Sequence, residues 1–246
     1  MGRFSIGEES ERLGVRPSDI LTMTRVAVIV EGVHDQIVLE KCLANDLRES
    51  GAKVFAMRGT NNAAALPDMQ FLFDALDAPI LVVVDHVAQS RIQPIWARAN
   101  AAVLANNRKS AEKALQELSL RATSKEEHVL AELGLRAIQI GRFSRIVPFG
   151  LERPDILDYL EPSHFNLDAS EWQPYKDEWM STRIGRNGDS FKDFLRNKHS
   201  AKINTNSVEQ AAIALTTLPE DFLELGNQIR TLGYLGVPDD LERSIS

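Results

Sequence analysis

The sequence of 246 residues has a single cysteine, Cys42, and no long apolar run. One cysteine excludes an internal disulfide framework and a cysteine-based zinc site. Cys42 lies among leucines at helical spacing, so we expect a buried small hydrophobic residue there. The longest apolar runs, such as Val26 to Val30 and Pro79 to Val84, are far shorter than the roughly 20 residues of a membrane span. We therefore expect a cytoplasmic protein with no membrane association.

A phosphate-binding loop of the type Gly-x-x-x-x-Gly-Lys-Ser/Thr is also absent from the sequence. We therefore expect any ATPase that the protein uses to be another chain, or the sequence to be an excised or stand-alone form. Basic residues are outnumbered by acidic residues, because 28 Lys and Arg against 35 Asp and Glu give a net charge of −7. Contacts with a nucleic-acid backbone need local positive charge. Any nucleic-acid binding must therefore come from a local basic cluster or be aided by metal ions.

Strand-like and helix-like segments alternate over the first 85 residues. Gly51 separates a helix-like segment from the strand-like segment that follows it. Such alternation predicts an α/β fold with a mainly parallel sheet and right-handed crossovers, flanked by helices in a Rossmann-like manner. The expected strands are 25–30, 52–57 and 79–84, and the expected helices are 36–50 and 63–76.

The rhythm changes after residue 85. The spacing predicts one long helix over 94–120 and another over 124–135, in which Ser124 is the N-cap and Glu127 completes a capping box. A further strand is expected over 143–149 and a short helix or turn over 151–160. We therefore expect a leader or cap (1–24), an α/β domain (25–165) with a helical insertion (about 94–136), and a helical C-terminal region (166–246).

Three acidic side chains follow the expected strands. Glu31 ends the first strand, Asp35 opens the helix after it, and Asp85 ends the third strand. These carboxylates converge on one edge if strands one and three are neighbours, and ligands of open α/β sheets bind at that edge. Converging carboxylates repel one another unless a hard cation lies between them. The alternatives are a helix-dipole contact for Asp35, a turn cap for Asp85 and simple solvation for Glu31.

The segment Val-Ile-Val-Glu31-Gly32-x-x-Asp35 and the strand ending in Asp85 resemble the Toprim fold. The family pattern is a Glu after the first strand and an Asp-x-Asp after the third, and the resemblance covers roughly residues 25–160. The zinc modules of bacterial primases and recombination mediators are absent, as is the positioned tyrosine of a topoisomerase. The Glu-Gly-x-His-Asp variant most resembles the Toprim domain of OLD (overcoming lysogenization defect) nucleases.

This resemblance implies a metal-dependent endonuclease that hydrolyses phosphodiester bonds, most readily of DNA, with Mg²⁺ or Mn²⁺ as cofactor. Glu31, Asp35 and Asp85 would hold the metal, and a role in phage defence with a P-loop ATPase in trans is implied by the family alone. The segment 150–160 is similar to a later acidic motif, which adds Asp155 as a ligand. The alternative for this segment is an ordinary capped surface helix. Glu152 and Asp158 are weaker ligand candidates, and Lys198 or Lys202 would stabilise charge on the scissile phosphate.

A cluster of basic residues lies in the C-terminal region, at 181–202. Six basic residues against Asp189 and Asp193 give this segment a local charge of about +4. The cluster is a candidate nucleic-acid contact, and the alternative is a solvated helix face that balances acids elsewhere. Its basic members are Arg183, Arg186, Lys192, Arg196, Lys198 and Lys202.

The motif departs from the family pattern in one place. It reads Asp85-His86-Val87, so the second acid is missing. The site then uses fewer carboxylates, or His86 substitutes, or metal binding is impaired. The second hypothesis is therefore a non-catalytic Toprim module that binds and regulates an ATPase or nucleic-acid partner. A generic nucleotide-binding domain is disfavoured because no Gly-rich loop follows the first strand, and the sequence leaves a homo-oligomer open.

Overall fold

The computed structural model describes residues 23–56, 78–85, 87–182 and 190–235. Four parallel strands form one sheet in the order β2-β1-β3-β4. The predicted α/β class with a parallel sheet is confirmed, and so is the adjacency of the first and third strands. The strands are β1 (Val26–Val30), β2 (Ala52–Ala56), β3 (Ile80–Val84) and β4 (Ile146–Gly150).

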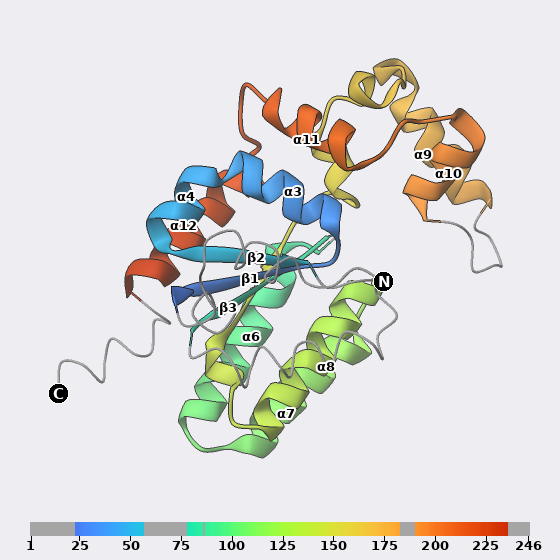
Figure 1. Cartoon of the computed structure of the whole chain (residues 1–246). Coiled ribbons are helices and arrows are strands. Elements are labelled where there is room, and N and C mark those ends of the chain that lie inside the picture. The colour runs from blue at the N-terminus through green and yellow to red at the C-terminus, as the bar shows by residue number, and fades with distance from the viewer. Residues whose placement is uncertain (1–22, 57–77, 86, 183–189, 236–246) are drawn as a thin grey trace.

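Helices cover both faces of this sheet (Figure 1). One face carries α3 (Val33–Cys42), α4 (Ala44–Ser50), α11 (Thr205–Ile213) and α12 (Glu220–Leu235). The other face carries α6 (Gln89–Leu104), α7 (Arg108–Leu120) and α8 (Lys125–Gln139). The remaining elements are α9 (Trp172–Thr182), α10 (Phe191–His199) and the 3₁₀ turns η1 (Phe143–Arg145), η2 (Ile156–Tyr159), η3 (Pro162–Phe165) and η4 (Ala169–Glu171).

Strand β1 shows why the sheet needs two covering layers. Val26, Val28 and Val30 pack into the core beneath α3, α4 and α12. Ala27 and Ile29 point the other way, into the core formed with α6, α7 and α8. Side chains of a strand alternate between its faces, so an unbroken apolar run requires a hydrophobic layer on each side.

Two helix predictions were wrong in extent. The expected helix 36–50 is divided at Leu43 into α3 and α4, and the expected helix 94–120 is divided into α6 and α7. In the second case Asn106 takes the left-handed conformation, with φ of 55°, and the Asn107 side chain caps α7 by accepting from the Ser110 N–H. Asparagine tolerates both roles better than most residues, which favours a break here.

Some other local predictions are confirmed. Ser124 caps α8 and accepts from the Glu127 N–H at 3.1 Å, and Gly51 ends α4 with φ of 66°. The predicted capping box is wrong in one part, because the Glu127 carboxylate accepts from the Thr123 N–H at 2.6 Å instead of from the Ser124 N–H. Cys42 is only half-buried, although it does pack against the core. The expected strand 143–149 begins later, at Ile146, because the turn η1 precedes it. The expected helix 63–76 lies outside the described residues, as does nearly all of the segment 1–24.

The segments that follow β3 and β4 lie close together and are hydrogen-bonded to each other. The Val87 N–H donates to the Leu151 carbonyl at 3.1 Å, and the Leu151 N–H donates to the Val84 carbonyl at 2.8 Å. A Cβ atom at Gly150 would lie 2.1 Å from the Val87 carbonyl oxygen, so only glycine fits there. These contacts hold the backbone just after β3 against the backbone just after β4. Within the described residues, no helix has the length and apolar character needed to cross a membrane.

Candidate functional site

Four acidic residues follow the carboxyl ends of three neighbouring strands. Glu31 comes directly after β1, Asp85 after β3, and Asp35 lies in the first turn of α3. Asp155 follows β4 and caps η2, because its Oδ1 accepts from the Leu157 N–H at 2.9 Å. The parallel order of the strands places these acids at one edge of the sheet. The strand pattern predicted this place for Glu31, Asp35 and Asp85, whereas Asp155 was a candidate from the family resemblance alone.

Asp35 is held rigidly at this edge. Its residue surface is only 6% exposed, and its Oδ2 accepts from the Gly32 N–H at 2.7 Å. The pKa of Asp35 is raised to about 6, mainly by burial and also by the negative charges of Asp155 and Glu31, whereas Lys192 and the Gly32 hydrogen bond act in the opposite direction. The carboxyl is therefore costly to keep ionised in the folded protein.

Asp85 is half-buried by surface exposure, and it lies among the same acids. Burial is the main cause that raises its pKa well above the ordinary value, and the charges of Asp35 and Asp155 add to this effect. Lys192 opposes it. Because charge interactions fall off with distance, the mutual effects of these acids show that they form one electrostatic cluster.

The Lys192 ammonium faces this cluster. Lys192, on α10, pairs with Asp155 through Nζ and Oδ1 at 3.2 Å. Burial lowers the pKa of Lys192, but Asp155, Asp35 and Asp85 outweigh burial and leave it raised. The sequence predicted Lys192 only as a nucleic-acid contact. Its pairing with carboxylates that precede it by 37 residues or more left no local signal.

The donor chemistry of the edge fits a hard divalent cation. Asp35 Oδ1 is buried and has no hydrogen-bond partner, and a buried oxygen of this kind is costly unless a partner satisfies it. Carboxylate oxygens are the ligands that Mg²⁺ and Mn²⁺ take. In the part of the chain that the structure describes, however, no three His, Cys, Asp or Glu residues are arranged to enclose a metal ion. Here Lys192 supplies the positive charge.

His34 is a further residue beside the cluster, and the sequence did not select it. It lies next to Asp35, half-buried in the first turn of α3. The pKa of His34 is lowered to about 4, mainly by burial and also by the nearby charges of Lys192 and Arg196. The imidazole is therefore neutral at pH 7, and the basic side of α10 faces the start of α3.

The two weaker ligand candidates have other partners. The Asp158 side chain accepts from Trp172 Nε1 at 2.7 Å and pairs with Lys176. Glu152 is exposed, and its backbone N–H donates to Asp221 Oδ2 at 3.1 Å.

The predicted basic residues do not share one environment. Lys198 pairs with Glu178 on α9, Lys202 is exposed, and Arg196 donates to the Ile203 carbonyl at 2.9 Å and to Asp193 at 3.1 Å. Lys192 alone of these four pairs with one of the predicted metal ligands. Arg183, Arg186 and His86 lie outside the described residues.

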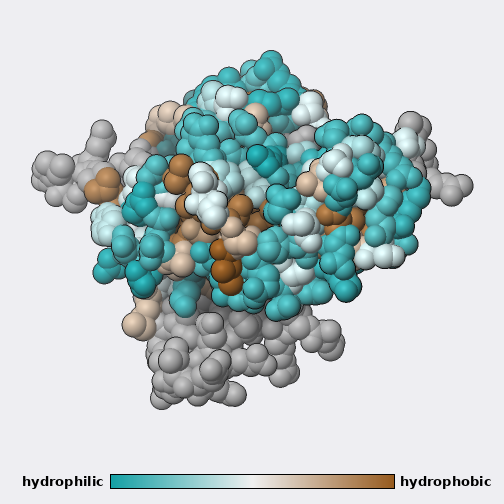
Figure 2. All heavy atoms as spheres, turned by 90° about the horizontal axis from the view of Figure 1, so that it is seen from above, coloured by the Kyte–Doolittle hydropathy of each residue, from teal (hydrophilic) through white to brown (hydrophobic). Residues whose placement is uncertain are grey.

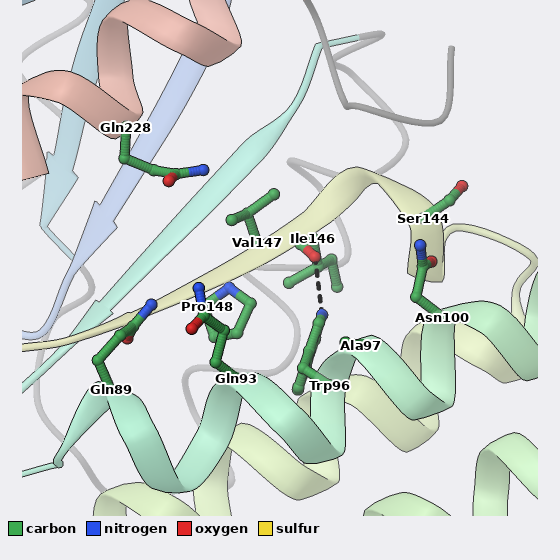
Figure 3. A pocket seen from close by; sticks show the side chains of 10 residues that line it. All are labelled: Gln89, Gln93, Trp96, Ala97, Asn100, Ser144, Ile146, Val147, Pro148 and Gln228. Atoms are coloured by element: carbon green, nitrogen blue, oxygen red, sulfur yellow. Dashed lines mark hydrogen bonds between the residues drawn. The ribbon is translucent and has the colours of Figure 1, made fainter. Parts of the chain in front are cut away.

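A hollow lies along β4, and none of the four acids lines it (Figure 3). Its lining comes mostly from α6 and β4, and it includes Gln89, Trp96 and Pro148. Trp96 Nε1 donates to the Ile146 carbonyl at 2.9 Å, and Gln89 Oε1 accepts from the Gly150 N–H at 2.8 Å. Pro148 has no N–H to offer. These features satisfy the edge of β4 and disfavour pairing with another strand.

Seen from above, the molecule is mostly hydrophilic, and its hydrophobic residues form small separate patches (Figure 2). Patches of this kind are normal for a protein surface. This view therefore offers no broad apolar site that competes with the carboxylate edge.

No family model matches the chain, and no curated protein does. Among solved structures, the chain is similar to the C-terminal region of the OLD protein of Xanthomonas campestris pv. campestris, with a TM-score of 0.37 and 16% identity over 86% of this chain and 97% of that chain. It is similar to the C-terminal region of the Burkholderia pseudomallei OLD protein, with a TM-score of 0.37 and 16% identity over 85% and 98%. These belong to the family that the Glu31–Asp35 motif resembles. Likeness at this level assigns no residue a role.

Proposed function

We propose that the protein is a divalent-metal-dependent nuclease that hydrolyses phosphodiester bonds of nucleic acid, with DNA as the preferred substrate. Glu31, Asp35, Asp85 and Asp155 would hold Mg²⁺ or Mn²⁺. The observation that carries the proposal is the buried Asp35 carboxylate, which has one oxygen without a partner and lies among other acids at the carboxyl edge of the sheet.

In this proposal the acidic side chains would bind the cation, and the basic side chain of Lys192 would contact the phosphate. When bound, the cation would activate water and neutralise charge on the phosphate. The four carboxylates would position that cation, and Asp35 is already fixed by its hydrogen bond from Gly32. The Lys192 ammonium, 3.2 Å from Asp155, lies where it could contact a phosphate oxygen and stabilise the charge that builds there.

The surface of α10 supports nucleic acid as the substrate class. Lys192 and Arg196 are four residues apart, so they project from one side of the helix, and both affect the His34 imidazole. A backbone phosphate beside the carboxylates would meet positive charge from this side. The basic residues Arg183, Arg186, Lys198 and Lys202 would extend the contact in an otherwise acidic protein. A P-loop ATPase supplied in trans is part of the same proposal.

The test is cleavage of supercoiled plasmid DNA with Mg²⁺, Mn²⁺ or EDTA. We expect metal-dependent nicking in the wild type and a loss of at least about 100-fold in Glu31→Ala and Asp35→Asn, since the site would lose a ligand. Glu49→Gln is the matched control, because Glu49 is exposed on α4, away from the edge. Cleavage that survives both site substitutions would refute this placement of the site.

One observation favours the second candidate, a non-catalytic module that regulates a partner. Val87 stands where the family has a second acid, and it is buried in the core with α6, α7 and α8. If purified protein binds Mn²⁺ but cleaves neither DNA nor RNA, with or without an added ATPase, this candidate replaces the nuclease.

A further inference from the structure

The buried carboxylate of Asp158 has no part in the proposed ligand set. Its side chain is 3% exposed and pairs with Lys176 on α9. Its Oδ1 accepts from Trp172 Nε1 at 2.7 Å, whereas its Oδ2 has no partner. Two side chains of α9 therefore converge on one carboxylate that lies three residues after Asp155.

A chain of contacts leads from Asp158 to Lys192. The Trp172 ring meets the Phe191 ring edge-on, with centroids 5.4 Å apart. The ring of Trp179 also contacts Phe191, with centroids 5.2 Å apart. Phe191 is buried and directly precedes Lys192. Lys192 then returns to Asp155.

These contacts connect three elements and return to the first of them. The turn η2 and its cap supply Asp155 and Asp158, α9 supplies Trp172, and α10 supplies Phe191 and Lys192. A lysine side chain has high rotamer freedom, so holding its ammonium against a carboxylate requires a rigid support. In Figure 1, α9 and α10 lie beside each other at the end of the molecule, away from α6, α7 and α8. Their attachment to η2 therefore decides where Lys192 lies.

We propose that Asp158 is a positioning residue that holds Lys192 against the carboxylate cluster through Trp172 and Phe191. This inference rests on the proposed function for its catalytic consequence, but not for its geometry. It also differs from the role of Asp158 as a metal ligand. The two roles predict opposite effects on cation binding.

The first measurement uses the metal-free protein. Lysine acetylation with a small acyl reagent, followed by mass spectrometry, reports how freely each ammonium reacts. We expect Asp158→Asn and Trp172→Phe to raise the labelling rate of Lys192 by about five- to tenfold, the size expected for loss of a charge-assisted hydrogen bond. Exposed Lys202 is the internal reference. Asp177→Asn is the control, because Asp177 is exposed on α9.

The second measurement is a double-mutant cycle on Mn²⁺ affinity, determined by calorimetry. Lys192→Met removes a cation from the cluster and should tighten Mn²⁺ binding. Asp158→Asn should tighten it by about threefold or more in the wild type, and should add nothing in the Lys192→Met background. A role confined to folding would give the same change in both backgrounds, and a ligand role would weaken binding.

The outcomes separate the two proposals. Unchanged Lys192 labelling in both Asp158→Asn and Trp172→Phe, with circular dichroism like that of the wild type, would overturn the positioning role. Increased labelling at every lysine would show a folding defect and would also overturn it. A wild type that binds no Mn²⁺ would overturn the proposed function, while the labelling result would still decide the role of Asp158.

Discussion

Two buried acids on opposite faces of the sheet have opposite surroundings. Glu127, beside α6, has a side chain that is 2% exposed and pairs with Arg91 at 2.9 Å. It also accepts from the Thr123 N–H at 2.6 Å. Asp35, at the carboxylate edge, has one hydrogen bond at 2.7 Å, one oxygen without a partner and other acids as neighbours.

The difference indicates which region is built for stability and which retains unsatisfied charge. Buried charges are tolerated when opposite charge and hydrogen bonds compensate for the lost water. Glu127 meets this condition and ties α8 to α6. Asp35 does not meet it, and uncompensated ionisable groups gather at functional sites. The comparison therefore supports the carboxylate edge as the functional region and the α6–α8 layer as its support.

The prediction with the largest expected effect tests whether position 87 belongs to the carboxylate edge or to the α6–α8 layer. Val87→Asp would restore the acid of the family motif, but position 87 packs into the α6–α8 layer. We expect it to lower the free energy of unfolding by at least about 3 kcal/mol, because a carboxyl would be buried without a partner. Val87→Ala is the control, with a cost of about 2 kcal/mol for the lost methyl groups. Both values come from urea denaturation.

A different result for Val87→Asp would change the assignment of position 87. If Val87→Asp keeps wild-type stability and tightens Mn²⁺ binding, position 87 belongs to the carboxylate edge and the missing acid is a true loss of a ligand.

Glu127 should show the next largest effect. Glu127→Gln removes the ion pair with Arg91 and weakens the acceptor for the Thr123 N–H. Because Arg91 is half-exposed and water can solvate it, we expect a loss of about 2 kcal/mol in the free energy of unfolding. Denaturation of Glu127→Gln is compared with that of Glu132→Gln, since Glu132 is exposed on the same helix. Equal stability of the two variants would mean that Glu127 is not compensated as described.

Much of this arrangement was predictable from local sequence. The run Val26–Val30 predicted a strand covered on both faces, and Glu31 and Asp85 could be placed because each directly follows a strand. The break at Leu43 could not be predicted, since a leucine there fits a continuous helix. The Asn106–Asn107 pair did carry a signal for the second break, because asparagine favours helix ends and left-handed turns.

The residues that contact Asp155 and Asp158 could not be predicted from local sequence. Lys192 meets Asp155 only because α10 returns to η2, and Trp172 reaches Asp158 from another helix. Contacts of this kind depend on how helices pack after they form, and no spacing rule encodes them. Nothing local distinguished Lys192 from Lys198, although only Lys192 pairs with an acid of the cluster.

Asp35 should give a change in stability whose sign is opposite to that at Glu127. Its pKa is raised from an ordinary 3.8 to about 6, so between these values the folded state binds more protons than the unfolded state, and stability falls as pH rises. Asp35→Asn removes this cost and keeps an acceptor for the Gly32 N–H. At pH 7, without metal, we expect it to stabilise the protein by about 1–3 kcal/mol.

The pH dependence identifies the cause of that gain. The difference between Asp35→Asn and wild type should shrink as pH falls from 7 towards 4, because the wild-type carboxyl then takes up its proton. Urea denaturation at several pH values, in EDTA, gives this difference directly. A gain that is independent of pH would point to packing instead of charge. A loss of stability at pH 7 would mean that Asp35 is compensated like Glu127, and the contrast between the two regions would fail.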